Sequence, residues 1–487
     1  MMQELLHKKF SFWLLPIGIL LFFTSMFLFV FQNTILYLAL PVLFLAIVFL
    51  VYFPKSFYFL FILSVPLSAL IYIGDSLSTT APDEPIMWLF FGLSLVILFF
   101  KPQVFPIKYL KNPIFLILFL QVFWMVISVV FSQNPLLSVK YALAKLWMLN
   151  AFVLFAFLMI QEKKDFKLLF LLLVIPISIL AVQSFLKHAA LGFGLWESNI
   201  VVQPFYYNHV DYSTVLSMIF PVLLIGFQLS KGKIVQQILI GGLILFYIPA
   251  IFAASARAAI LAVVFALFIS LMIRVKKVRL VMPSIFFVVL IGAFFLAKDY
   301  QFIYLRPSHQ TATQKTFSET VVGMFTGKDM SSMERFYRWV ASVRMAKEHP
   351  LVGVGPNNFY DYYKPHAIPA FRTWVSRNPE RSTTHNYFLY MLTEQGIPAM
   401  VLYGVLLMVL FRRAELIYHR TKDRFFKLAA MSLAMLMAAS FINNFFSELL
   451  ETHKVGGLFY LSIALLIIID YKTSKTAKEN QLEENKE

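Results

Sequence analysis

The side chains best suited to chemistry lie in one polar block, residues 334–396, of an otherwise apolar chain. Arg335 and Arg338 are three residues apart, so they share one face of a helix that the spacing of apolar residues predicts over 332–347. Two guanidinium groups on one face can bind phosphate oxygens, although a solvated helix face explains Arg338 equally well. The block therefore predicts a site for an anionic ligand, with Arg335 as the better candidate of the two.

His385 and Asn386 stand at the start of a short helix predicted over residues 385–395, which is broken at Gly396. A histidine with an ordinary pKa near 6.5 can accept a proton at neutral pH or hydrogen-bond a phosphate. The competing interpretation is a helix cap, in which Thr384 caps the helix and the histidine is merely interfacial. The arginine-rich loop that precedes the pair favours the functional interpretation.

Arg257 lies among small residues, 255–259, at the predicted outer end of a membrane helix, where positive charges are rare. An arginine at membrane depth is costly and is usually paired or functional, so we favour a functional role over snorkelling to lipid headgroups. Lys145, also at an outer end, could widen a basic rim that attracts phosphate, and snorkelling explains it equally well. His209 belongs to a polar aromatic patch that could line a glycan site or form an interfacial aromatic belt.

The composition is that of a membrane protein, with 60% hydrophobic residues, 14% charged residues and a mean hydropathy of +0.76. The formal charge of +17 does not indicate nucleic-acid binding here, because most lysines and arginines fall in short loops between helices and set their orientation. No cysteine is present, which excludes thiol catalysis and cysteine metal sites. Phosphate-loop, dinucleotide and H-E-x-x-H motifs are absent too, so we expect no cofactor and no metal, with arginine in place of a cation.

The apolar runs predict an all-α integral membrane protein with about fourteen transmembrane helices. Lysine and arginine alternate between loops in a way that places both termini in the cytoplasm and residues 298–384 outside. The predicted spans are 11–31, 34–53, 57–73, 86–100, 113–131, 142–160, 168–186, 212–230, 234–252, 258–274, 280–297, 397–412, 426–447 and 456–470. The chain thus divides into helices 1–11 over 1–297, a large external loop with short helices over 298–396, helices 12–14 over 397–470, and a tail over 471–487 that we expect to be disordered.

Four motifs in this order resemble the O-antigen ligase and polymerase superfamily. They are Ser255-Ala-Arg-Ala-Ala259, Arg335-x-x-x-Trp339, His349-Pro-Leu-Val-Gly-Val-Gly355 and His385-Asn-x-x-Leu-x-x-Leu-x-Glu394-x-Gly396. The order of the motifs, the long external loop and the layout of the spans match the superfamily mainly over residues 200–460. The extra pair of predicted spans, relative to the twelve common in ligases, would lie at the N-terminus.

The resemblance implies a polytopic glycosyltransferase of the GT-C kind in the bacterial inner membrane, with its active site facing the periplasm. Its donor would be a glycan on undecaprenyl pyrophosphate, and the catalytic residues of the ligases fall on Arg257, Arg335 and His385. We interpret Arg338, Asn386, Lys145 and His209 as substrate-binding. The acceptor would be lipid A–core in a ligase, the growing lipid-linked polysaccharide in a polymerase, or a protein hydroxyl in an O-oligosaccharyltransferase. A transporter of polyprenyl-linked glycans is the alternative from another class, although no repeat and no charged midplane helix supports it.

Overall fold

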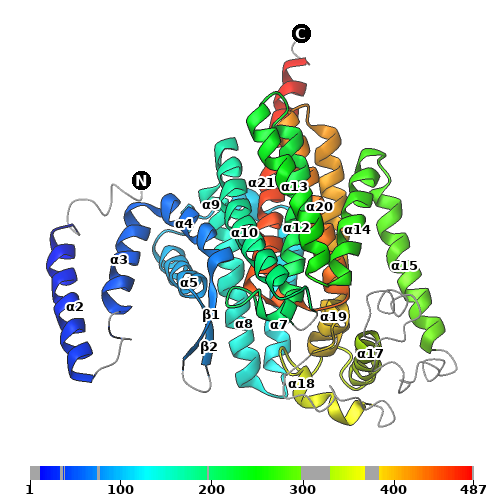
Figure 1. The fold of residues 1–487 in the computed structure, drawn as a ribbon, viewed down its shortest axis with the longest axis horizontal. Helices are drawn as coiled ribbons and strands as arrows, with labels where there is room; N and C mark the ends of the chain where they lie inside the picture. Colours follow the sequence, from blue (N-terminus) through cyan, green and yellow to red (C-terminus); the bar gives the residue numbers. More distant parts are fainter. Residues whose placement is uncertain are drawn as a thin grey trace.

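The computed structural model describes residues 11–32, 37, 39–73, 77–194, 197–297, 330–367 and 383–484. Within these residues the chain is almost entirely helical (Figure 1). The helices that matter for the architecture are α2 (Ser11–Gln32), α3 (Ala39–Tyr52), α4 (Pro54–Leu67), α5 (Asp83–Phe100), α7 (Pro113–Val130), α8 (Pro135–Leu149), α9 (Phe155–Met159), α10 (Lys163–Ala190), α11 (Glu197–Ile200), α12 (His209–Leu229), α13 (Ile234–Ala253), α14 (Arg257–Arg274), α15 (Val278–Ala297), α17 (Met330–Glu348), α18 (Phe359–Tyr362), α19 (Tyr387–Arg420), α20 (Arg424–Phe445) and α21 (His453–Glu484).

Nine stretches of helix among the described residues are long and apolar enough to cross a membrane. Four further helices are apolar but shorter, at Pro16–Gln32, Ala39–Tyr52, Pro54–Leu67 and Val278–Gly292. The nine are Asp83–Phe100, Pro113–Val130, Pro135–Met159, Lys163–Ala190, His209–Leu229, Ile234–Ala253, Arg257–Arg274, Arg424–Phe445 and His453–Ala477. The chain is therefore a helical, multi-pass membrane protein, as its composition predicted.

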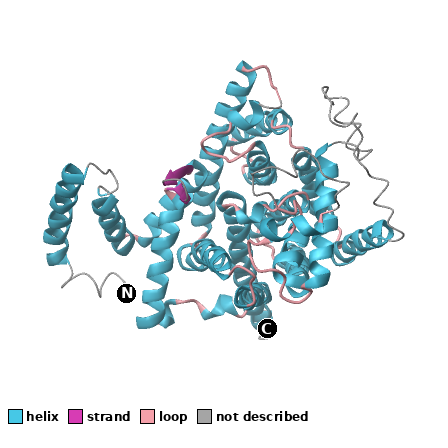
Figure 2. Ribbon diagram, turned by 90° about the horizontal axis from the view of Figure 1, so that it is seen from below, coloured by secondary structure: helices cyan, strands magenta, loops and turns pink. Residues whose placement is uncertain are grey.

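The centre of the bundle is formed by α12, α20 and α21. Buried residues make up 89% of the span in α21, 72% in α12 and 67% in α20, but only 17% in α13. α20 packs along α12, α14 and α19, and α21 packs beside α20 (Figure 1). The α2–α3 pair stands at one edge of the molecule, as Figure 2 also shows. Helices that begin or end next to α20 and α21 are thus the ones held most firmly by packing.

One predicted span ends earlier than the sequence indicated. The run 57–73 was expected to be a single membrane helix, but α4 ends at Leu67, and β1 (Ala69–Ile73) pairs antiparallel with β2 (Leu77–Ala81). Isoleucine and tyrosine in 69–73 favour a strand as well as a membrane helix, and apolar periodicity alone does not separate the two. The carbonyls freed at the end of α4 are used instead by Lys454, whose Nζ donates to Pro66 at 2.8 Å and to Ser68 at 2.9 Å.

The helix predicted over 332–347 is confirmed by α17. The predicted break at Gly396 is confirmed too, because this residue has a φ of 81° and divides α19 into two helices. Ile397 donates its N–H to Pro350 at 2.8 Å, and a Cβ on Gly396 would lie 1.8 Å from the Leu351 carbonyl oxygen. The break therefore requires glycine, because main chain packs directly against main chain there.

The His349–Gly355 motif forms the other side of this contact. Val354 and Gly355 donate their N–H groups to the carbonyls of Thr393 and Glu394, each at 2.9 Å. These bonds run between 350–355 and the last turn before Gly396, which explains the motif as an element that fixes the break.

Two further predictions concern the ends of the external region and of the chain. Residues 298–329 and 368–382 of the predicted loop lie outside the described residues. α21 continues as a helix to Glu484, where the sequence predicted a disordered tail from residue 471. Its polar end follows directly from a long apolar helix, so that each added residue needs no new helix nucleus. α17 and α18 lie at the end of the bundle opposite the C-terminus (Figure 1). We call this end the outer end, and the end from which the C-terminal helix α21 emerges the inner end.

Candidate functional site

Arg335 and His385, two predicted site residues of the polar block, meet at one short turn. α20 ends at Phe445, and residues 446–452 connect it to α21 at the outer end. The Nε of Arg335 donates to the Phe446 carbonyl at 3.1 Å, and Nδ1 of His385 lies 3.7 Å from Oε2 of Glu448. Arg335 and His385 are 50 positions apart in the sequence, yet their partners, Phe446 and Glu448, are two positions apart on the same turn.

α17 carries both arginines of the motif and presents them to different partners. Arg338 is buried, and its Nη1 donates to the carbonyl of Thr383 at 3.2 Å. The indole Nε1 of Trp339 donates to the next carbonyl, that of Thr384, at 3.1 Å. Arg338 and Trp339 therefore hold the segment that leads into α19, while Arg335 reaches the turn after α20.

His385 has an unusual backbone conformation for a residue with a side chain. Its φ is 51°, in the left-handed region that costs a non-glycine residue free energy and is often found at functional sites. Asn386, and not Thr384, caps the helix that follows, since its side-chain oxygen accepts the N–H of Leu389 at 3.0 Å. The Nδ2 of Asn386 donates to the Phe445 carbonyl at 2.9 Å. Both polar groups of Asn386 are therefore engaged in holding the histidine in place.

The surroundings of His385 favour its neutral form. Burial, the guanidinium of Arg338 and that of Arg335 lower the pKa of the histidine to about 3. Burial raises the pKa of the neighbouring Glu448 carboxyl, and the same arginines oppose that rise. About a third of the imidazole remains exposed. At neutral pH the ring is thus uncharged, partly accessible and next to an acidic side chain.

Arg257 lies at the same level of the bundle. It is the first residue of α14, its cap Ala256 supplies no side-chain hydrogen bond, and Ser255 before it has a φ of 56°. α14 packs along α20, where Phe265 contacts Phe441 with a ring separation of 5.6 Å. From Phe265 the helix rises eight residues, about 12 Å, to Arg257. The first turn of α14, with the positive end of its dipole, therefore lies at about the height of the turn 446–452.

The two remaining candidates lie on either side of this arrangement. His209 is the first residue of α12, and its Nδ1 lies 2.7 Å from Oδ1 of Asn199. It also lies close enough to Arg335 for an electrostatic interaction with the guanidinium. Lys145 is buried in α8, and its Nζ lies 2.8 Å from Oε1 of Glu451 on the turn. The structure thus brings His209 to the arginine side of the site and Lys145 to its far side, paired with a carboxylate.

Sequence reasoning missed two acidic residues of the turn. Glu448 and Glu451 are three apart in the short connection between the last two spans. Carboxylates so close to a membrane-embedded helix end are a usable signal, because burial of a charge there is costly and calls for a partner. Their partners could not be read from the sequence, since His385 and Lys145 are about 60 and 300 positions away.

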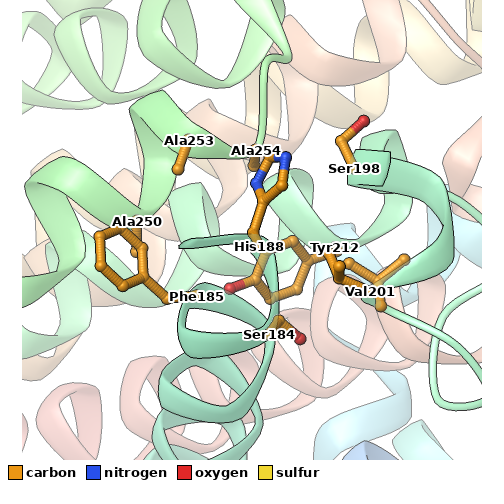
Figure 3. A pocket seen from close by; sticks show the side chains of 10 residues that line it. Ser184, Phe185, His188, Ser198, Val201, Tyr212, Ala250, Ala253 and Ala254 are labelled. Atoms are coloured by element: carbon orange, nitrogen blue, oxygen red, sulfur yellow. The ribbon is translucent and has the colours of Figure 1, made fainter. Parts of the chain in front are cut away.

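A small cavity lies nearby, between α10, α11, α12 and α13 (Figure 3). It has a volume of about 10 Å³, enough for one water molecule. His188 lines it and bonds through Nε2 to the Gly194 carbonyl at 2.9 Å. None of the predicted catalytic residues lines this cavity, so it does not serve as the substrate site.

Fold and site together define a helical multi-pass membrane protein with a cationic, histidine-containing site at one end of its bundle. Residues 242–404, about a third of the chain, match the family described as O-Antigen ligase. The match spans Arg257, Arg335 and His385, and it confirms the predicted resemblance to the O-antigen ligase and polymerase superfamily. Members of this family are glycosyltransferase-like ligases and polymerases, which supports an enzymatic role. No curated protein matches the sequence.

Proposed function

We propose that this protein is an O-antigen ligase-like glycosyltransferase. It transfers a glycan from undecaprenyl pyrophosphate to a hydroxyl of lipid A–core, at the periplasmic face of the bacterial inner membrane, without a metal and with inversion at the anomeric carbon. The observation that carries the proposal is the meeting of Arg335 and His385 on the turn after α20, within the region that matches the family.

The proposal includes the complete predicted topology. Under the proposal, the nine long spans, the four shorter apolar helices and the second half of α19 would each cross the membrane. That gives fourteen crossings, and the distribution of lysine and arginine would place both termini in the cytoplasm. The large periplasmic loop is then 298–396, between helices 1–11 over 1–297 and helices 12–14 over 397–470. α17 and α18 at the outer end belong to this loop, which puts the arginine face of α17 next to the membrane surface.

Transfer requires the bond between the sugar C1 and a phosphate oxygen to break. The electron pair of that bond stays on the leaving diphosphate, and Arg257 and Arg335 stabilise the charge as fixed cations in a partly dehydrated site. Arg257 is the first residue of α14, so the helix dipole would add to its positive charge. The acceptor oxygen forms the new bond to C1 from the opposite face, so the anomeric configuration is inverted.

His385 accepts the proton that the acceptor hydroxyl loses. Nδ1 lies 3.7 Å from the Glu448 carboxylate, which favours the tautomer protonated at Nδ1 and leaves Nε2 to act as the base. In the free protein the two arginines depress the basicity of the ring. A bound diphosphate offsets their charge, which raises the pKa of His385 when both substrates are present.

The four predicted substrate-binding residues divide into two groups under this proposal. Arg338 and Asn386 bond to main-chain carbonyls and act mainly by holding the 383–387 segment. His209 lies near Arg335 and contacts the donor diphosphate or its first sugar. Lys145 is paired with Glu451 and is considered below.

Cells that lack the protein distinguish the acceptor classes, when they are complemented with wild type or His385→Ala. For a ligase, lipid A–core without glycan accumulates together with long lipid-linked polymer, and the variant does not restore the normal profile. Core with a single repeat unit and no ladder would identify the polymerase, and loss of glycan from protein would identify an O-oligosaccharyltransferase. Activity of a purified transporter would require a gradient or a second leaflet, whereas transfer between added donor and acceptor requires neither.

A further inference from the structure

Lys145 and Glu451 form a buried ion pair next to the catalytic segment. Their Nζ and Oε1 atoms are 2.8 Å apart, and the side chains are 9% and 20% exposed. The ammonium also lies 5.1 Å from the ring centre of Tyr460 and 6.0 Å from that of Tyr141. A buried pair of this kind gains little net stability, because desolvation offsets the attraction. Its presence therefore calls for another role.

The same carboxylate oxygen accepts a second hydrogen bond. The hydroxyl of Tyr387 donates to Oε1 of Glu451 at 2.7 Å. Tyr387 follows His385 by two residues, and Glu451 follows Glu448 by three. The 385–387 segment thus lies against the turn 446–452 at two points: His385 is 3.7 Å from Glu448, and Tyr387 is hydrogen-bonded to Glu451 of the ion pair.

A third contact lies between these two points. Nδ2 of Asn386 donates to the Phe445 carbonyl at 2.9 Å, and the N–H of Leu450 donates to Oδ1 of Asn444 at 2.9 Å. The turn is therefore tied both to the end of α20 and to the start of α19. A displacement of Glu451 relative to the 385–387 segment would also displace Glu448, because both residues belong to the short turn 446–452.

The space beside Lys145 does not fit a sugar. The cavity that Lys145 lines with Tyr387, Gln395 and Tyr460 has a volume of about 30 Å³, enough for about two water molecules. The charge of the lysine is already compensated by Glu451. Direct binding of a donor phosphate, as the sequence suggested for Lys145, would require this pair to be broken.

We propose that Lys145, Glu451 and Tyr387 are positioning residues that set the distance between His385 and Glu448. Lys145 holds the Glu451 side chain turned inward, Glu451 accepts the Tyr387 hydroxyl, and Tyr387 fixes the segment that carries His385. This inference rests on the proposed glycosyl transfer. Arg257 and Arg335 stand on other helices, so loss of the pair slows the chemical step and leaves the binding of the donor diphosphate largely unchanged.

The test compares the full-length protein and the variants Lys145→Met, Glu451→Gln and Tyr387→Phe, with kcat and KM for lipid-linked donor measured separately. We expect kcat to fall about 10-fold to 100-fold, as small misplacements of catalytic groups do, and KM to change less than about 3-fold. The charge-swapped variant K145E/E451K is expected to recover part of the lost kcat. Thermal unfolding of each purified variant separates slow chemistry from poor folding.

The matched control is the ion pair of Lys55 and Asp165 at the inner end, whose Nζ and Oδ1 are 2.7 Å apart. Lys55→Met and Asp165→Asn are expected to leave kcat unchanged. A Lys145→Met protein with wild-type kcat, or with a raised KM and unchanged kcat, would overturn the inference, the second result by restoring the substrate-binding role. His385→Ala is measured alongside to distinguish failure of this inference from failure of the proposed function. An active His385→Ala protein would contradict the proposed function itself.

Discussion

The outer and inner ends of the helical bundle use their positive charges differently. At the inner end, Arg420 and Arg413 reach the carboxylate of Asp470 at 2.8 and 3.6 Å, and Lys163 reaches Asp423 at 2.5 Å. At the outer end, Arg335 and Arg338 donate to main-chain carbonyls, which carry no net charge. Inner cations are thus paired with carboxylates, whereas the outer pair is held by main-chain carbonyls and lies close enough to His385 to lower the pKa of its imidazole. The difference teaches that an arginine is better judged by what it contacts than by its presence in the sequence. Pairing with a carboxylate indicates a structural role, and a position beside His385 indicates a place in the candidate site.

The largest effect on the rate of transfer is expected at the arginines proposed to stabilise the leaving diphosphate. Arg335→Ala, and likewise Arg257→Ala, should reduce transfer about 100-fold to 1000-fold, because each removes a fixed cation from the developing charge. Purified protein with lipid-linked donor and acceptor provides the measurement. Arg344→Ala is the matched control, since Arg344 lies on an exposed face of α17 and bonds to the His366 carbonyl. Equal activity of the Arg335 and Arg344 variants would show that the outer arginines are not special.

The inner end should respond in stability instead of activity. Asp470→Asn leaves Arg420 and Arg413 without their shared carboxylate, which is expected to lower the free energy of unfolding by about 3 kcal/mol. Thermal or denaturant unfolding in detergent measures the loss, and kcat per folded molecule should stay near that of wild type. A large fall in kcat with unchanged stability would erase the distinction between the two ends.

A smaller effect is expected at the acid that accompanies the histidine. Glu448→Gln keeps the shape of the side chain but removes the carboxylate beside Nδ1 of His385. We expect about a 10-fold lower kcat, because the imidazolium formed during transfer loses its negative neighbour. Glu448→Asp should recover less than the wild-type rate but more than the glutamine variant. Full activity of Glu448→Gln would remove this residue from the mechanism.

The smallest effect is a shift in pH dependence. Burial and the two arginines hold the pKa of His385 near 3, so the free protein keeps a neutral histidine until the pH falls well below 6.5. Arg338→Gln removes one positive charge, which raises this pKa toward its ordinary value. The acidic limb of kcat/KM should therefore move to higher pH by about one unit. A limb that stays in place or moves to lower pH would contradict the assignment of this limb to His385.

The sequence predicted the membrane helices because an apolar run of about 20 residues is long enough to cross a bilayer as a helix. It also located α17 and the break at Gly396, because proline restricts the backbone locally and glycine permits a positive φ. It did not predict the β1–β2 hairpin, because residues 69–73 are as apolar as the helix before them. Local pattern alone could not show that α4 stops where Lys454 takes up its carbonyls.

The candidate site was predictable in part for the same reason. Arg257, Arg335 and His385 were found because a cation or histidine stands out in an apolar chain. Glu448 and Glu451 were missed because their meaning depends on partners that are distant in sequence. Lys145 was noticed as a cation, but the carboxylate that compensates it became visible in the packing of α8 against the turn.

The most direct test of the central claim is transfer by the purified protein, with lipid-linked glycan and lipid A–core added in detergent and no membrane gradient. Wild type and Arg344→Ala are predicted to give glycosylated core at similar rates, while His385→Ala gives none although it remains folded. Product formation by His385→Ala at the wild-type rate, or no transfer by any of the three proteins, would contradict the claim that this outer site catalyses glycosyl transfer.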